Sequence, residues 1–272
     1  MVWSSSQGIG QHDLLVKSKV VTGLRVYELK PFLTLGFATI EHIPGEGLRY
    51  VVDAPQGVNA CLSDPEFKRL WVEEAEKMAS EFKPDYLSLG NEVNDYFHFH
   101  PEDLEDYLTL VGSAYSAIKR ASPNTKVLVV FSLDHLIENG QLPMIRPFNE
   151  EVDLIGFTTY PWKRYDTPED IPDNYYSRLT ANISKPTAFT EIGWPSSDSE
   201  DEQARFLSRF LELTKRMNIE MVNWLFLHDT KLSGIASLIS EPETTTISLK
   251  TASGVEKQVY RIWQSLKILN KK

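Results

Sequence analysis

Residues 85–94 read DYLSLGNEVN, and residues 186–196 read PTAFTEIGWPS. Each stretch contains a short apolar run that is typical of a strand buried on both faces. Each run is followed by a glutamate, Glu92 in the first stretch and Glu191 in the second. Strands of this kind belong to parallel sheets, and in a parallel barrel all the carboxyl ends open on one side. We therefore expect Glu92 and Glu191 to face one cleft.

Further apolar runs of this character occur along the chain, at residues 32–38, 127–131, 154–158 and 221–227. The segments between the runs have the spacing of amphipathic helices. One of them begins at Asp64 and Pro65, a helix cap followed by a first-turn proline. Another begins at Ser199, with Glu202 placed to complete a capping box. This alternation of strands and helices predicts a parallel sheet with right-handed crossovers.

The spacing of the strand ends favours a barrel. The later ends, Ser132, Tyr160, Glu191 and Trp224, follow one another by 28, 31 and 33 residues. A (β/α)8 barrel of about 250 residues averages roughly 31 residues per unit. We predict an α/β fold of the (β/α)8 TIM-barrel type, with residues 1–272 forming one catalytic domain.

The first third of the chain is short for such a barrel. Six strand–helix units are recognisable, preceded by a helix-like segment over residues 12–27. A strand at residues 20–27 would end only four residues before Phe32, whereas a parallel crossover needs a dozen or more. We therefore expect a barrel shortened at its N-terminus, with the first one or two units missing or atypical.

Composition narrows the function. Lys and Arg total 28 and Asp and Glu total 38, which gives a formal net charge of −10. An acidic chain without a basic cluster is a poor partner for nucleic acid. One cysteine, Cys61, excludes an internal disulfide. No apolar run is long enough to span a membrane, and no signal peptide is visible. We expect a soluble protein whose location the sequence leaves open: cytoplasmic, or secreted if the N-terminus has been trimmed.

Two carboxyl groups in one cleft suit the cleavage of a glycosidic bond. One group protonates the leaving oxygen while the other attacks the anomeric carbon, and a separation of about 5–5.5 Å implies retention of configuration. Either glutamate taken alone could equally cap a helix or pair with a basic side chain. The pair, with its flanking residues, favours the catalytic interpretation.

At these residues the sequence resembles clan A of the glycoside hydrolases, the retaining (β/α)8 enzymes. The stretch Gly90-Asn91-Glu92 matches the clan's acid/base motif at the end of strand 4. The stretch beginning Thr190-Glu191 matches the nucleophile motif at the end of strand 7. Its residues EIGWPS are especially similar to plant-type β-1,3-glucanases, and the β-1,4-galactanases are also similar. The resemblance implies that Glu92 is the acid/base and Glu191 the nucleophile.

The resemblance also implies roles in substrate binding. Asn91 would bind the 2-hydroxyl of the sugar next to the scissile bond. Tyr160 matches an aromatic residue that donates to the nucleophile, and Trp224 matches an aromatic floor beneath the same sugar. Trp194 could stack on sugar or pack beneath the loop that follows the nucleophile. Trp162 is a candidate sugar platform. These roles compete with ordinary core or rim packing.

Three further features of the sequence lie outside the two motifs. His135 follows a predicted strand and is a candidate cleft residue. The group formed by Asp95, Tyr96, His98 and His100 follows Glu92, and we expect a solvated loop there rather than a metal site, because no third ligand is identifiable. The long connection over residues 228–254 is expected either to flank the cleft or to form a small hairpin, and the strand predicted at residues 244–249 (TTTISL) favours the hairpin.

One expected feature is missing. Clan members carry an arginine near the end of strand 2 that supports the nucleophile. No residue of this sequence takes that role, and Arg25 lies in a predicted helix. A catalytically impaired, carbohydrate-binding barrel therefore remains the alternative to an active enzyme.

The predicted reaction is retaining hydrolysis of a β-linked oligosaccharide or polysaccharide, and it requires no metal and no organic cofactor. The expected partner is the glycan itself. A homodimer is a further possibility if an open barrel edge pairs with a second chain.

Overall fold

The structure is a computed structural model that describes residues 11–43, 47–197, 199–230 and 242–269. The chain divides into two compact units. Unit 1 comprises Met1–Gly156 and Ile183–Pro186, and unit 2 comprises Phe157–Asn182 and Thr187–Lys272. Strand β6 (Leu154–Thr159) begins in unit 1 and ends in unit 2. The prediction of one domain over residues 1–272 stays a prediction.

The sheet of unit 1 is parallel. Its strands follow the order β1 (Phe32–Thr34), β4 (Tyr86–Ser88), β5 (Lys126–Ser132) and the first half of β6. Apolar side chains of β4 and β5 are almost fully buried, as the continuous apolar runs predict. Glu92, after β4, and Ser132, the last residue of β5, therefore lie at the same end of this sheet, where the carboxyl ends of its strands meet.

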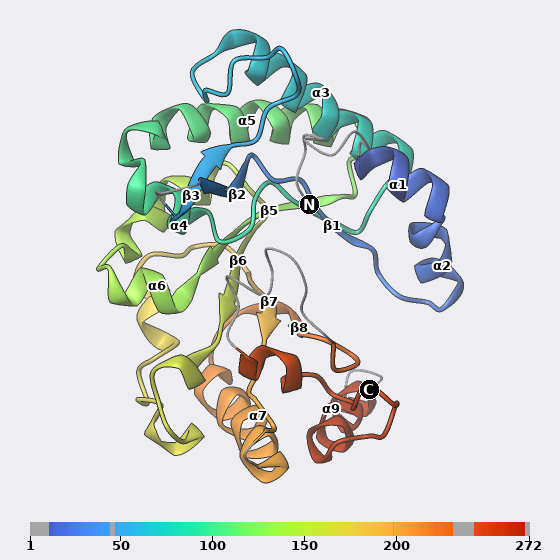
Figure 1. Ribbon diagram of the computed structural model, residues 1–272, viewed down its shortest axis with the longest axis vertical. Helices are drawn as coiled ribbons and strands as arrows, with labels where there is room; N and C mark the ends of the chain where they lie inside the picture. The colour runs from blue at the N-terminus through green and yellow to red at the C-terminus, as the bar shows by residue number, and fades with distance from the viewer. Residues whose placement is uncertain (1–10, 44–46, 198, 231–241, 270–272) are drawn as a thin grey trace. The chain divides into compact units, whose positions relative to one another are not determined.

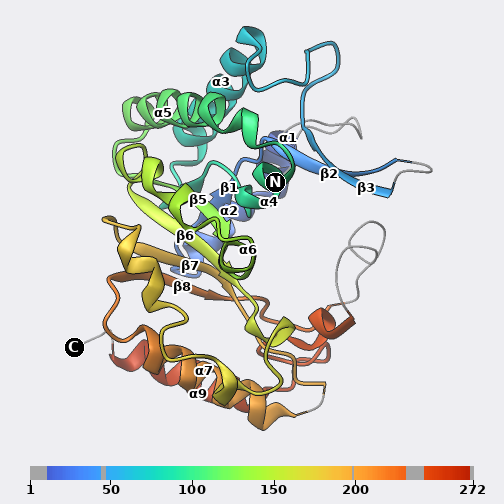
Figure 2. The ribbon, with the colours of Figure 1, turned by 90° about the vertical axis from the view of Figure 1, so that its left-hand side faces the viewer.

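Two long helices, α3 (Pro65–Phe82) and α5 (Leu104–Ala121), lie side by side in unit 1 (Figures 1 and 2). The predicted cap of α3 is confirmed, because Asp64 Oδ1 accepts hydrogen bonds from the backbone of Glu66 at 2.9 Å and Phe67 at 3.0 Å. The Trp71 indole, fully buried on α3, donates to the Gly36 carbonyl at 3.0 Å. This bond ties α3 to the segment that follows β1.

The N-terminal segment is helical, as predicted. It forms α1 (Gln11–Ser18) and α2 (Val20–Val26), which are separated by Lys19 in a left-handed conformation. Arg25 donates through Nη2 to the carbonyls of Phe82 at 2.6 Å and Lys83 at 2.7 Å. These carbonyls belong to the C-terminal end of α3 and lack partners within the helix. Arg25 is therefore a capping residue for α3.

A two-stranded antiparallel hairpin, β2 (Ala38–Ile43) with β3 (Gly47–Val52), was missed in the sequence. Residues 32–38 were expected to form one strand, but β1 ends at Thr34 and β2 begins at Ala38. The backbone between them is bonded elsewhere, since Asp53 donates its amide to the Phe37 carbonyl at 2.8 Å. The hairpin projects beyond the carboxyl end of the sheet of unit 1 (Figure 2).

Unit 2 contains the second half of β6, then β7 (Thr187–Ile192) and β8 (Ile219–Trp224), of which β7 and β8 pair in parallel. Helices α7 (Glu200–Thr214) and α9 (Gln258–Leu269) lie side by side (Figure 1). The predicted cap of α7 is confirmed, because the Ser199 hydroxyl accepts from the Glu202 amide at 3.2 Å.

The remaining helices are short. They are α4 (Val93–Phe99), α6 (Leu133–Glu138) and the 3₁₀ turns η1 (Pro101–Asp103), η2 (Leu142–Glu150), η3 (Pro161–Lys163), η4 (Pro168–Asp170), η5 (Ser177–Ala181) and η6 (Pro242–Thr246). The strand predicted at residues 244–249 is therefore wrong where it overlaps η6. Among the described residues, no helix is both long and apolar enough to cross a lipid bilayer.

Candidate active site

Glu92 follows β4 at a sharp turn in unit 1. Its backbone is left-handed, with φ 51° and ψ 41°, and α4 begins at the next residue. A non-glycine residue rarely adopts this conformation, and such strain concentrates at functional sites. A Cβ at Gly90 would lie 2.5 Å from Val93 Cγ1 and 2.8 Å from the Tyr107 hydroxyl, so only glycine fits there. The turn is thus built to present Glu92.

A cavity of about 170 Å³ lies against this turn. Asn91 and Glu92 line it from the end of β4, and Asp95 lines it from α4. Tyr50 of the hairpin lines the same cavity. The cavity therefore holds a candidate general acid beside hydrogen-bonding groups, although Tyr50 and Asp95 were not among the predicted site residues.

Asp95 is the centre of a charged cluster beside Glu92. It is 8% exposed and accepts a hydrogen bond of 2.8 Å from His135 Nδ1. This bond raises the pKa of His135, with further support from the negative charges of Asp95 and Glu92. Burial raises the pKa of Tyr50 far above its usual value, and the charges of Asp95 and Glu92 and a hydrogen bond to Asp95 add to the effect. His135 and Tyr50 therefore lie within electrostatic range of Glu92.

Helix α4 replaces the solvated loop that was expected after Glu92, so that prediction is wrong. Asp95 and Tyr96 are buried, and the amide of buried Asn94 donates to the Ser132 carbonyl at 3.2 Å. The Ser132 amide donates back to Asn94 Oδ1 at 2.7 Å. These two bonds attach α4 to the end of β5, which fixes the backbone beside Glu92. The apolar residues of this segment, Val93 and Phe97, were the available signal for a helix.

The two histidines of this segment have different surroundings. His100 Nε2 is 3.1 Å from the Tyr50 carbonyl, and its ring stacks on Tyr96. His98 is exposed and contacts the Phe99 ring edge-on. Within the part of the chain that the structure describes, no group of three or more His, Cys, Asp or Glu side chains could hold a metal ion.

Glu191 lies near the end of β7 in unit 2. The Tyr160 hydroxyl, directly after β6, donates to Glu191 Oε2 at 2.5 Å. This is the contact that the resemblance implied for Tyr160. A hydroxyl that donates to one carboxylate oxygen limits the rotation of the carboxylate group. Tyr160 therefore positions Glu191.

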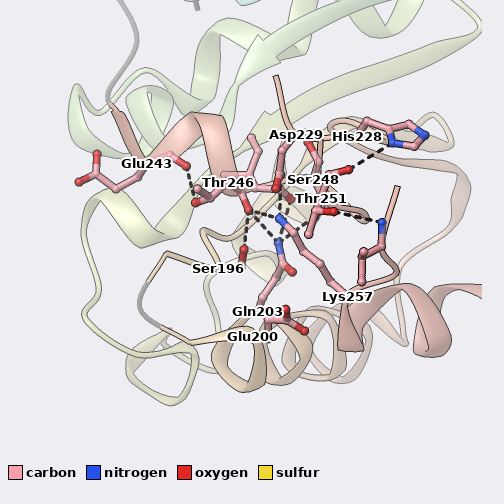
Figure 3. Close-up of polar contacts among 12 residues, drawn as sticks. Ser196, Glu200, Gln203, His228, Asp229, Glu243, Thr246, Ser248, Thr251 and Lys257 are labelled. Carbon is pink, nitrogen blue, oxygen red and sulfur yellow. Dashed lines mark hydrogen bonds and ion pairs between the residues drawn. The ribbon is translucent and has the colours of Figure 1, made fainter. Parts of the chain in front are cut away.

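The loop after Glu191 is held by a buried glutamine, Gln203 of α7 (Figure 3). Gln203 Nε2 lies within hydrogen-bonding distance of four backbone carbonyls, those of Trp194, Thr246, Ile247 and Ser248, at 2.8–3.4 Å. The amide therefore joins the loop of the candidate nucleophile to residues 246–248. The carbonyls of residues 246–248 that surround this amide belong to the end of η6 and the residues after it, which form no strand.

Lys257 completes this arrangement (Figure 3). Its ammonium group is buried and donates to Asp229 Oδ1 and to the Thr246 carbonyl, both at 2.7 Å. A buried charge is tolerated when it is paired and hydrogen-bonded in this way. The sequence did not predict the roles of Gln203 and Lys257, because the residues next to them in the chain do not indicate which distant carbonyls they bind.

The three tryptophans of the predicted site differ in exposure. Trp194 is 3% exposed and stacks on Phe206, so it packs beneath the loop. Trp224 ends β8 as predicted, is 8% exposed and donates to the Ile247 carbonyl at 2.6 Å. Trp162 is half-buried and borders a pocket of about 500 Å³ in unit 2. Of the three, Trp162 offers the most accessible ring.

Comparison with known proteins identifies the family. The model of glycosyl hydrolase family 53 matches residues 73–225, which is more than half of the chain and includes both candidate glutamates. The chain belongs to glycosyl hydrolase family 53. This family of galactanases lies in clan A, so the predicted clan is confirmed, and with it the glycoside hydrolase class.

Solved structures similar to this family 53 chain are also glycosidases. An exo-β-1,4-mannosidase from Opitutaceae bacterium strain TAV5 is 14% identical with a TM-score of 0.73, and the match covers 97% of this chain and 51% of that one. A β-D-glucuronidase from Dictyoglomus thermophilum is 15% identical with a TM-score of 0.56, covering 91% and 42%. At such identities the likeness shows the fold alone, and it confirms the TIM-barrel type.

A third similar structure is a family 5 glycoside hydrolase from Streptomyces cattleya in complex with Manb1-4GlcNAc. It is 14% identical with a TM-score of 0.59, covering 87% of this chain and 62% of that one. The chain thus spans less than two thirds of the length of each of these three proteins. No curated protein sequence matches it significantly.

Proposed function

We propose that this family 53 chain hydrolyses β-glycosidic bonds of an oligosaccharide or polysaccharide with retention of configuration. The single observation that carries the proposal is the placement of a glutamate at the carboxyl end of each of two parallel strands, Glu92 after β4 and Glu191 at the next-to-last residue of β7, in a chain of a glycoside hydrolase family. The strained turn of Glu92 and the hydrogen bond from Tyr160 to Glu191 support the assignment of the two roles.

In the first step Glu92 donates its proton to the glycosidic oxygen while Glu191 attacks the anomeric carbon. The bond to the leaving sugar breaks and a glycosyl ester forms on Glu191. In the second step Glu92 removes a proton from water, and the resulting hydroxide attacks the anomeric carbon and releases Glu191. At the end of the cycle Glu92 again carries its proton and Glu191 is again an ionised carboxylate, while the glycosidic bond has been cleaved and one water molecule has been consumed, so no cofactor enters the reaction.

The side chains proposed to bind substrate differ in how exposed they are. Asn91 is exposed at the end of β4 and suits a hydrogen bond to the sugar 2-hydroxyl. Trp162, which is half-buried, suits stacking on a sugar, whereas Trp224 is buried at 8% exposure. His135 is hydrogen-bonded to Asp95, which lines the cavity. Trp194 is too deeply buried for stacking, and we propose that it supports the loop instead.

The first substrates to test are β-1,4-linked galactan oligosaccharides, because of the family, and β-1,4-mannan oligosaccharides, because of the mannosidase of similar fold. β-1,3- and β-1,6-linked oligosaccharides complete the set. Proton NMR of the first products should show the β-anomer before mutarotation. An initial α-anomer would overturn retention, and no cleavage of any member would overturn the proposed activity.

A second candidate is a carbohydrate-binding protein without turnover. The observation that favours it is Arg25, which caps α3 and so does not take the role of the supporting arginine. Calorimetric binding of an oligosaccharide with no product after prolonged incubation would select this candidate. The possible homodimer stays a prediction, which light scattering can test.

A further inference from the structure

The Asp95 carboxylate lies beside the turn that presents Glu92. The Asp95 amide donates to the Glu92 carbonyl at 3.0 Å, and both residues line the same cavity. Asp95 is 8% exposed, and its carboxylate accepts a hydrogen bond from His135 Nδ1 at 2.8 Å. Asn94 Nδ2 donates to it at 3.2 Å, and the Tyr50 hydroxyl donates as well. Hydrogen bonds from several donors let a buried carboxylate keep its negative charge, so Asp95 places such a charge near Glu92.

His135 is the partner of Asp95 that can change its charge near neutral pH. Its side chain is 44% exposed, so it exchanges protons with the solvent, whereas Asp95 is buried. The hydrogen bond to Asp95 raises the pKa of His135, although burial opposes the effect. The negative charges that face the ring raise it further, and they belong to Asp95 of α4, Glu92 of the preceding turn and Asp134 of α6.

The net charge of the Asp95–His135 pair therefore depends on pH. When His135 is protonated, the two charges offset each other, and when His135 is neutral, the pair carries one negative charge. A nearby negative charge favours the protonated form of a carboxyl group, and a nearby positive charge favours its ionised form. Glu92 is thus held in its protonated form more strongly when His135 is neutral.

The two tyrosines that line the cavity do not vary in this way. Burial raises the pKa of Tyr50 and of Tyr96 far above the usual range of a tyrosine, and a carboxylate that accepts from each hydroxyl adds to the effect. Both hydroxyls stay neutral in the pH range of an enzyme assay. Within this described cluster, His135 is therefore the neighbour of Glu92 whose charge changes there.

We infer that the Asp95–His135 pair sets the pH at which Glu92 stops acting as a general acid. This inference rests on the proposed function, in which Glu92 must carry a proton when it meets the glycosidic oxygen. Glutamates with this task are commonly tuned to lose their proton at about pH 6–7, where a histidine with a raised pKa is still largely charged. Asp95 and His135 act through Glu92, so both are positioning residues and not catalytic ones.

The test is the alkaline limb of the pH profile of kcat/KM, which reports the proton of the acid in the free enzyme. His135→Gln removes the positive charge beside Asp95, so the limb should move to higher pH by about half a unit, a size typical of one charge at a partly exposed site. Asp95→Asn removes the negative charge, so the limb should move to lower pH by a similar amount. A merely structural role would lower activity at every pH without moving the limb in opposite directions.

Glu138→Gln is the matched control, because Glu138 is exposed and lies on α6 three residues after His135. Water and salt screen its charge, so the limb should stay where it is in the unaltered chain. Alkaline limbs that coincide in the unaltered chain, His135→Gln and Asp95→Asn would overturn the inference. Shifts of the two variants in the same direction would overturn it as well.

A second measurement does not depend on turnover. NMR can follow the ring protons of His135 as the pH is varied, with the spectrum of His135→Gln identifying their signals. In Glu92→Gln the negative charge of Glu92 is lost, so His135 should release its proton at lower pH than in the unaltered chain, and an unchanged titration would contradict the coupling. If the unaltered chain cleaves no substrate at any pH while this titration does shift, the proposed function fails and the coupling of the charges stands.

Discussion

Glu92 and Glu191 each lie at the carboxyl end of a parallel strand, but their surroundings differ. Glu92 lies among ionisable side chains, with Tyr50 and His135 both within its electrostatic range and both bonded to Asp95. Glu191 accepts a hydrogen bond from Tyr160, and the loop after it is held by Gln203 through backbone carbonyls. In the first region the ionisable groups lie beside the glutamate itself, whereas in the second the buried Lys257–Asp229 pair serves, like Gln203, to hold backbone carbonyls near the loop.

This difference fits the two roles proposed. A general acid/base changes its protonation state twice in each cycle, so neighbouring charges affect its work. A nucleophile stays ionised until it attacks, and its main requirement is an accurate position. Substitutions in the two regions should therefore have effects of different kinds.

The largest effect is expected at Glu191. Glu191→Ala removes the attacking oxygen, so no glycosyl ester can form and turnover should fall by roughly 10⁴-fold or more on every substrate. Initial rates with an oligosaccharide and with an aryl glycoside measure the loss. Glu220→Ala, at an exposed glutamate of β8, is the control for general damage to unit 2. Substantial activity in Glu191→Ala would sink the assignment of the nucleophile.

The next effect is expected at Glu92, and it should depend on the leaving group. Glu92→Ala removes the proton donor, which should lower turnover of an oligosaccharide by roughly 10²–10⁴-fold. An aryl glycoside with an acidic leaving group needs little protonation, so formation of the glycosyl ester should be largely spared. Pre-steady-state kinetics with both substrates measure the difference. An equal loss on both substrates would contradict the role of Glu92.

Much of this arrangement could be predicted from the sequence, because strands buried on both faces have continuous apolar runs. The runs before Glu92 and Glu191 and the caps at Asp64 and Ser199 depend on neighbours in the chain. The hairpin could not be predicted in the same way. The side chains that the structure describes within residues 38–52 are half-buried or exposed, and Tyr50 is fastened by contacts from distant α4.

The strand predicted at residues 244–249 was wrong because long-range contacts, which the sequence does not show, also act on this segment. Threonine and isoleucine there favour a strand, but the carbonyls of residues 246–248 are bound by Gln203, and Thr246 also by Lys257. Such long-range bonds to backbone leave no local pattern. The same applies to the Tyr50–Asp95 contact, which is why the site around Glu92 was only partly predicted.

The hydrogen bonds that hold the loop after Glu191 can be tested through stability. Gln203→Met keeps the side-chain volume but removes the amide, which leaves buried carbonyls with fewer donors. We expect a loss of about 1–3 kcal/mol in the free energy of unfolding. Urea denaturation measures it, with Gln264→Met at an exposed position of α9 as the control. A Gln203→Met curve that overlays the control would show that the amide contributes little.

The smallest effect is expected at His135, in the charged region. Its pKa is raised above the unfolded value, chiefly by the hydrogen bond to Asp95, so the folded state binds the proton more tightly. The stabilisation from His135 should be fully present below about pH 6.5, the usual pKa of an unfolded histidine, and should decline as pH rises through the raised value. The difference in unfolding free energy between the unaltered chain and His135→Gln should therefore be larger at pH 5.5 than at pH 8.5. Because 44% of the His135 side chain is exposed, solvent screening keeps the effect small. A difference that stays the same at both pH values would mean that the His135–Asp95 pair is not the source of this stabilisation.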